Sequence, residues 1–124
     1  MGKRKRTRKG SALAQHYNTY KANAKRRGYD FRIREETFNK IVKSNCYYCG
    51  KPPRKYKSCG FVAYFNGIDR INNNEGYSAK NCVACCPVCN RMKGNLDYRV
   101  FMNQIAKIIN NKVKGDYHET RRLG

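Results

Sequence analysis

The chain has 124 residues, which suits one small domain, and a domain of this size buries only a limited core unless a metal supplements it. Lysine and arginine total 28 against 8 acidic residues, a formal net charge of +20, so the expected partner is a polyanion, above all nucleic acid. No run of the sequence approaches the roughly 18 apolar residues of a membrane helix, and no apolar run follows the basic N-terminus as a secretion signal requires. We therefore expect an intracellular protein with no membrane partner.

The N-terminal part is predicted to be a basic tail followed by two helices. Residues 1–10 are predicted to be a flexible basic tail that lies along phosphates when bound, or that serves only solubility or localisation. A helix is predicted over residues 11–27, with Ser11 as a cap at its start and Gly28 at its end. A second helix is predicted over residues 35–43, because acidic residues open it and apolar residues recur at core-facing spacing.

The middle of the chain is predicted to alternate short strands with turns. Residues 51–60 are rich in proline and lysine and are predicted to be a loop. Strands are predicted over residues 61–65 and 68–71, which are rich in aromatic and β-branched side chains, and over residues 82–85. Residues 72–76 are polar turn formers, so we expect them to connect two of the strands.

Two helices are predicted to end the domain. Pro87 suits the first turn of a helix that runs to about Lys93, just before Gly94. Asp97 is predicted to cap a last helix, and residues 114–124 are predicted to be a frayed tail, so the domain is expected to span residues 11–113. The apolar face of the last helix is predicted to consist of Val100, Phe101, Ile105, Ile108 and Ile109.

The seven cysteines indicate a zinc site more than a set of disulfides, because their number is odd and no secretion signal precedes them. Two pairs have the CxxC spacing, Cys46-Tyr-Tyr-Cys49 and Cys86-Pro-Val-Cys89. Four thiolates in two pairs can close a tetrahedral zinc site. We therefore predict one structural zinc ion, held by residues 46–49, the first knuckle, and residues 86–89, the second knuckle.

Three cysteines fall outside this set. Cys82-Val-Ala-Cys85 is itself a CxxC pair, so a different ligand set is open. We favour the second knuckle because Cys82 and Cys85 fall on a predicted strand, where a buried thiol packs as a small hydrophobic group. No role is assigned to Cys59.

Polar residues between and beside the knuckles suggest a second, catalytic metal. Asp69 offers a carboxylate oxygen, and Asn90 offers an amide oxygen at the start of a predicted helix. Hard oxygen ligands of this kind suit Mg²⁺, which keeps several waters and can bind a phosphate oxygen. Arg70, beside Asp69, has a planar guanidinium that can hold a phosphate by two hydrogen bonds.

This constellation resembles the HNH endonucleases with a ββα-metal core, most of all the zinc-bearing Asp-Arg branch found among phage and intron-type homing endonucleases and some restriction enzymes. The resemblance covers residues 44–95 well, and residues 25–29 and 35–42 more weakly. The motifs that carry it are Cys46-x2-Cys49, Gly67-Ile68-Asp69-Arg70, Gly76-Tyr77-x3-Asn81 and Cys86-x2-Cys89-Asn90-x2-Lys93.

The resemblance implies an α+β fold, in which a small zinc-stapled ββα-metal core (the HNH or His-Me finger) is flanked by N- and C-terminal helices. It implies a metal-dependent endonuclease, a hydrolase acting on phosphodiester bonds of double-stranded DNA. Asp69 and Asn90 would be the ligands of the catalytic divalent metal, and Asn81 would brace the loop between the two strands. Lys93 falls at the last helical position of the motif, where a phosphate contact is expected. The basic residues Arg26 and Arg27 also suit a phosphate, by their charge.

One departure from the family pattern concerns the general base. Most HNH enzymes carry a histidine directly after the aspartate, and this chain carries Arg70, whose guanidinium does not deprotonate in proteins. Three interpretations stay open: Arg70 holds the phosphate while His16 or Tyr29 activates water, a metal-bound water serves without a protein base, or catalysis is lost and DNA binding remains. For both His16 and Tyr29, a packing role is the commoner alternative.

Two other functions compete with nuclease activity. The missing histidine suggests a non-catalytic zinc-stabilised module that binds DNA or RNA, and charge alone suggests a zinc-containing RNA-associated protein of the ribosomal type. For a nuclease, a homodimer would suit a palindromic target and double-strand cuts, whereas a monomer would suit nicking. The resemblance also makes a phage- or mobile-element-encoded protein plausible, acting in the cytoplasm or nucleoid.

Overall fold

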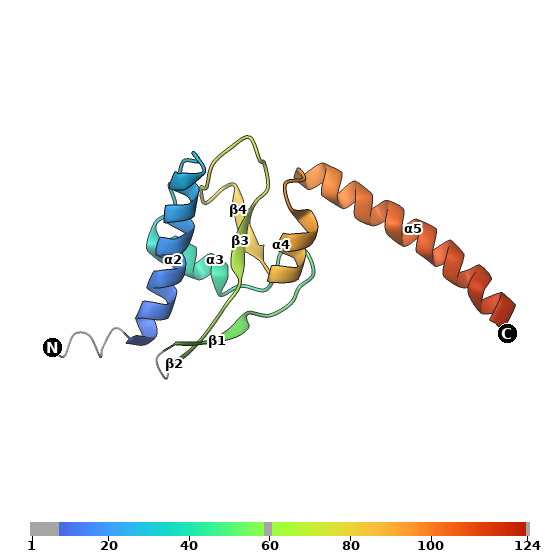
Figure 1. The fold of residues 1–124 in the computed structure, drawn as a ribbon, viewed down its shortest axis with the longest axis horizontal. Coiled ribbons are helices and arrows are strands. Elements are labelled where there is room, and N and C mark those ends of the chain that lie inside the picture. The colour runs from blue at the N-terminus through green and yellow to red at the C-terminus, as the bar shows by residue number, and fades with distance from the viewer. Residues whose placement is uncertain (1–7, 59–60, 124) are drawn as a thin grey trace.

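The computed structural model describes residues 8–58 and 61–123. Two helices come first, then four short strands, then two more helices (Figure 1). None of the helices in these two ranges combines the length and the apolar content needed to cross a bilayer. The elements are α2 Arg8–Arg26, α3 Glu35–Val42, β1 Arg54–Ser58, β2 Phe61–Phe65, β3 Gly67–Arg70, β4 Cys82–Cys85, α4 Pro87–Lys93 and α5 Tyr98–Leu123.

The main core lies where α2 and α3 pack against the strands. Phe38 and Val42 of α3 are fully buried, one turn apart on the same face, as the spacing of apolar residues predicts. The α2 side contributes aromatic rings: Tyr17 and Tyr20 both meet the ring of Phe38, with centroids 5.3 and 5.6 Å apart. The buried members of this core include Ala24, Ile33, Phe38, Val42, Ala63, Phe65, Ile68 and Tyr77.

The strands form two antiparallel hairpins. In the first, β1 pairs with β2 in a register that runs from Arg54 opposite Phe65 to Ser58 opposite Phe61. In the second, β3 pairs with β4, from Gly67 opposite Cys85 to Arg70 opposite Cys82.

Asn66 alone separates β2 from β3. It is buried, and its side-chain amide donates to the Ser44 carbonyl at 3.0 Å. The two hairpins are therefore joined by a fixed connection that ties them to the end of α3.

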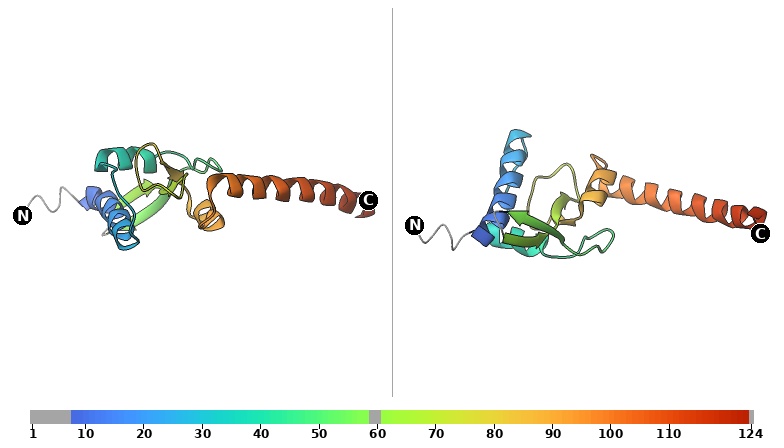
Figure 2. Two further views of the ribbon diagram at one scale, coloured as in Figure 1. Left: turned by 90° about the horizontal axis from the view of Figure 1, so that it is seen from above. Right: turned by 60° about the horizontal axis from the view of Figure 1, so that its bottom comes forward.

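Helix α4 begins directly after β4 and completes a ββα unit made of β3, β4 and α4. Cys86 is its N-cap, and Pro87 follows at the first helical position. Helix α5 then projects away from the body of the domain (Figures 1 and 2). Phe101, near its start, is buried, whereas Ile108, Ile109 and Val113 farther along are exposed.

Most predicted elements are present, with three corrections. Residues 54–58, within the predicted loop 51–60, form strand β1. The first helix begins at Arg8, so Ser11 lies inside it and does not mark its start, and residues 1–7 of the predicted tail lie outside the described residues. The last helix runs to Leu123, well past the predicted start of fraying at residue 114.

Candidate functional site

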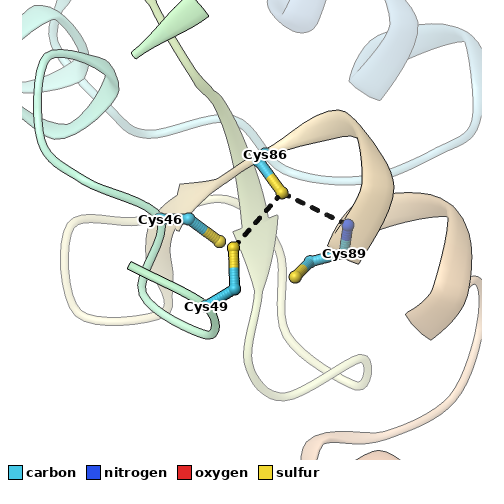
Figure 3. Close-up of side chains that lie close together, drawn as sticks. All are labelled: Cys46, Cys49, Cys86 and Cys89. Carbon is cyan, nitrogen blue, oxygen red and sulfur yellow. Dashed lines mark hydrogen bonds between the residues drawn. The ribbon is translucent and has the colours of Figure 1, made fainter. Parts of the chain in front are cut away.

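The two knuckles bring four sulfur atoms together. The Sγ atoms of Cys46, Cys49, Cys86 and Cys89 all lie within 4.8 Å of one another, and those of Cys49 and Cys86 are 3.7 Å apart (Figure 3). A tetrahedral zinc with Zn–S bonds of about 2.3 Å places its sulfurs about 3.8 Å apart. The cluster is therefore consistent with a structural zinc site, and it uses the ligand set favoured by the sequence.

Backbone turns shape the first knuckle. The Cys46 amide donates to the Lys51 carbonyl at 2.8 Å, and the Gly50 amide donates back to the Cys46 carbonyl at 2.9 Å. Gly50 has a φ of +79°, a conformation that glycine adopts without steric cost. Burial opposes ionisation of Cys46, but hydrogen bonds from the backbone of Cys49, Cys86 and Tyr48 lower its pKa to about 6. This thiol is thus prepared to bind a metal as the thiolate.

Cys82 and Cys85 pack as buried thiols on β4, as predicted. Burial raises the pKa of Cys82 to about 12, and burial followed by the nearby Asp69 carboxylate raises the pKa of Cys85. Both therefore remain protonated at neutral pH and belong to the packing of the strand. Cys59 lies outside the described residues.

The Asp69 carboxylate lies on β3 and is buried, with protein donors on both of its oxygens. The Tyr48 hydroxyl donates to Oδ2 at 2.6 Å. The Lys93 ammonium lies 3.3 Å from Oδ1 and 3.2 Å from Oδ2. Asp69 is thus the centre of a small buried network.

Lys93 does not occupy a position suited to the predicted phosphate contact. It is 1% exposed, and besides Asp69 it donates to the Arg70 carbonyl at 3.1 Å. Its three donor protons therefore have three acceptors inside the protein. Buried lysines are rare unless paired, and this one is paired with the predicted metal ligand.

Arg70 braces the loop that follows β3. Its Nη1 donates to the carbonyls of Asn73 and Glu75 at 2.9 and 2.8 Å. Its guanidinium also lies 3.7 Å from the centroid of the Tyr29 ring, a close cation–π contact. Tyr29 and Arg70, both predicted catalytic candidates, are thus in contact with each other, and Arg70 holds this loop.

Asn81 hydrogen-bonds to the backbone of the loop between β3 and β4. Its Oδ1 accepts from the Asn72 amide at 2.8 Å, and its Nδ2 donates to the carbonyls of Asn72 and Gly76 at 3.0 and 2.9 Å. A Cβ at Gly76 would lie 2.6 Å from the Asp30 carbonyl oxygen, so glycine is needed for this close approach. The loop between β3 and β4 is therefore fixed from two sides.

His16, on α2, is half-buried against the edge of the core. Its Nε2 is 2.9 Å from the Asn66 carbonyl, and its ring stacks on Phe65 with centroids 4.1 Å apart. Burial lowers the pKa of His16 more than the hydrogen bond to Asn66 raises it. The structure thus gives His16 packing contacts, and its proposed role as a base stays a prediction.

The remaining predicted site residues are exposed. Asn90 lies on α4, one residue after the second knuckle, with its backbone amide bonded to the Cys86 carbonyl at 2.9 Å. Arg26 is the last residue of α2 and Arg27 follows it, and the Arg27 guanidinium lies 5.6 Å from the Tyr29 ring centroid. Arg27 is therefore close to Tyr29, whose ring also contacts Arg70.

Comparison with known proteins identifies the fold. No protein family model matches the chain. The uncharacterised protein R423 of Acanthamoeba polyphaga mimivirus is 42% identical over 94 residues, which cover 76% of this chain but only 16% of that protein. Among solved structures, the rare-cutting HNH restriction endonuclease PacI is similar with a TM-score of 0.57 and 23% identity, covering 84% of this chain and 80% of that one.

The chain has the HNH endonuclease fold. This confirms the expected α+β fold class, with the four-cysteine cluster beside a β3–β4–α4 unit. The sequence did not indicate that Tyr48 belongs to the site, where it donates to Asp69. The only signal for it was its place inside the first knuckle, because its partner Asp69 lies 21 positions away.

Proposed function

We propose that this chain is a metal-dependent DNA endonuclease of the HNH type, which hydrolyses phosphodiester bonds in double-stranded DNA. The observation that carries the proposal is the HNH fold together with a carboxylate, Asp69, on β3 of the ββα unit that the cysteine cluster ties together. The viral relative R423 is compatible with a homing- or restriction-type enzyme encoded by a virus or mobile element.

Asp69 and Asn90 would hold the divalent ion, for which Mg²⁺ is the natural candidate. One carboxylate and one neutral amide form a hard oxygen donor set, and a set of only two protein ligands leaves room for waters and a phosphate oxygen. Neither residue belongs to the cysteine cluster. When bound, such an ion would polarise the scissile phosphate and stabilise the leaving oxygen.

We further propose that the three candidate residues Arg70, Tyr29 and His16 supply no general base. Arg70 holds the carbonyls of the loop, and its guanidinium covers the ring of Tyr29. The Nε2 atom of His16 lies beside a core carbonyl. We therefore propose a reaction in which Arg70, Tyr29 and His16 transfer no proton to or from the attacking water.

The charge of the chain supports DNA as the substrate. The net charge of +20 favours a polyanion, and Arg26 and Arg27 are exposed where α2 ends. On the first hairpin, β1 exposes Lys55 and Lys57, which follow each other on one face of the strand. These cations would bind phosphates independently of base sequence.

Plasmid cleavage tests the proposal. The zinc-loaded protein, incubated with plasmid DNA carrying its natural target and with Mg²⁺ or Mn²⁺, is expected to nick or cut it. Asn90→Ala is expected to abolish cleavage while retaining zinc and helical content. Asp69→Asn is expected to abolish cleavage too, with a loss of stability because it leaves Lys93 buried without its counter-ion. Asn103→Ala, on an exposed part of α5, is the matched control and is expected to cut normally. Absence of cleavage with every divalent metal would refute the nuclease assignment.

A second function, a non-catalytic nucleic-acid-binding module, is favoured by one observation. The Asp69 carboxylate already has the Lys93 ammonium 3.2 Å away. Its negative charge is partly neutralised by this ammonium, which weakens its attraction for a metal ion. This module would bind DNA or RNA with strong salt sensitivity and would cut neither. The same plasmid assay, run beside salt-dependent binding measurements, separates the two functions.

A further inference from the structure

One donor from each knuckle region holds the Asp69 carboxylate. Tyr48 lies inside the first knuckle, between Cys46 and Cys49, and its hydroxyl donates to Asp69 Oδ2 at 2.6 Å. Lys93 ends α4, the helix that starts from the second knuckle, and its Nζ lies 3.2 Å from the same oxygen. The Asp69 carboxylate is therefore connected to the cysteine cluster through Tyr48 on one side and through α4 and Lys93 on the other.

Packing fixes the Tyr48 ring. It meets Phe101 of α5 edge-on at 5.4 Å between centroids, and Tyr47 edge-on at 5.2 Å. A tyrosine hydroxyl is protonated at neutral pH, so at this distance it donates to the carboxylate.

The two carboxylate oxygens are not equally engaged. Oδ2 carries the short bond from Tyr48 and the contact from Lys93, at 2.6 and 3.2 Å. Among residues 8–58 and 61–123, Oδ1 has only the longer Lys93 contact at 3.3 Å. A carboxylate oxygen has two lone pairs, so Oδ1 keeps the more available acceptor site.

We propose that Tyr48 and Lys93 are positioning residues that hold Asp69 so that its Oδ1 atom faces the divalent metal. Tyr48 fixes the rotation of the carboxylate through Oδ2. Lys93 ties the carboxylate to the end of β3, because the same ammonium also donates to the Arg70 carbonyl at 3.1 Å. Partners of this kind orient metal ligands in other proteins, and their loss commonly weakens metal binding about 10- to 100-fold.

This inference rests on the proposed function, since it assumes that Asp69 is a metal ligand. It adds that the structural zinc site and the catalytic metal site are coupled through Tyr48. The neighbouring Tyr47 provides a matched control, because it lies in the same knuckle but is 53% exposed, and its hydroxyl is not the one that meets Asp69.

The test is a Mn²⁺ titration of the zinc-loaded full chain with a mixed-sequence DNA duplex, followed by electron paramagnetic resonance. Tyr48→Phe removes the hydroxyl and keeps the ring. We expect it to retain zinc and DNA affinity but to bind Mn²⁺ about 10-fold more weakly. Tyr47→Phe is expected to bind Mn²⁺ as the unmodified chain does.

Each outcome decides one part of the account. If Tyr48→Phe binds Mn²⁺ normally while Asp69→Asn does not, the positioning role is wrong and the metal site stands. If Asp69→Asn also binds Mn²⁺ normally, or if the unmodified chain binds none, the proposed metal site fails and the inference fails with it. If Tyr48→Phe loses zinc, its hydroxyl acts on the knuckle itself, which also overturns the positioning role.

Discussion

Replacing Lys93 with methionine should destabilise the fold far more than the loss of an ordinary surface charge. The lysine side chain is 1% exposed and its partner Asp69 is 9% exposed, so the variant leaves a carboxylate buried without its cation. Removing one member of a buried ion pair costs about 3–5 kcal/mol, because the other charge remains buried and uncompensated. The Tyr48 hydroxyl still donates to Asp69, so we expect a cost near the lower end, about 3 kcal/mol.

Urea denaturation followed by far-UV circular dichroism measures this cost, with zinc in excess so that metal binding contributes equally to both proteins. The double variant Asp69→Asn/Lys93→Met removes both charges and is expected to recover most of the lost free energy of unfolding. A loss of less than about 1 kcal/mol in Lys93→Met would match an exposed ion pair and would refute the buried network.

Three further predictions address the zinc, the histidine and the basic surface. Chelation of zinc, or Cys86→Ser, should unfold the ββα unit, and an unchanged circular dichroism spectrum would contradict this. Burial lowers the pKa of His16 from 6.5, so the unfolded state takes up the proton first as the pH falls. The free energy of unfolding should therefore decrease as the pH falls from about 7 to 5.5, and this decrease should be smaller in His16→Gln. The same pH dependence in both proteins would contradict the contribution of His16. Arg26→Gln/Arg27→Gln should reduce the slope of log affinity against log salt by about 2, whereas an unchanged slope would remove both from the DNA contacts.

The zinc site and the ββα unit could be predicted from the sequence because their signals are local. The CxxC spacing brings each pair of thiols together within one turn, and the proline after Cys86 suits the start of α4. The sequence around Asp69 and the strand Cys82–Cys85 reads as extended, and the two segments do pair as β3 and β4. These features depend little on the rest of the chain.

Strand β1 could not be predicted in the same way. Its sequence, Arg-Lys-Tyr-Lys-Ser, has little intrinsic strand preference, and it becomes a strand by pairing with β2. The ring of Tyr56 stacks on Phe65 of β2, with centroids 4.2 Å apart and an interplanar angle of 8°. That tertiary contact outweighs the loop-forming composition of residues 51–60.

The roles of Lys93, Tyr48 and Arg70 also depend on tertiary structure. A lysine in a basic chain is expected at the surface, and its burial against Asp69, 24 positions away, has no sequence signature. Arg70 was expected to hold a phosphate, whereas its Nη1 atom binds two carbonyls of its own loop. Lys93 and Arg70 were singled out from the sequence, whereas Tyr48 was not, and for none of the three could the sequence show which partner the side chain meets.

The most direct test of the central claim is the crystal structure of the zinc-loaded protein with a DNA duplex and Mn²⁺, with the manganese located by its anomalous scattering. The account predicts one manganese ion in coordination distance of Asp69 Oδ1, of the Asn90 amide oxygen and of a DNA phosphate, with Tyr48 still bonded to Oδ2. DNA bound without manganese at Asp69, and with the Lys93 pair unchanged, would contradict the nuclease assignment and leave a zinc-stabilised DNA-binding module.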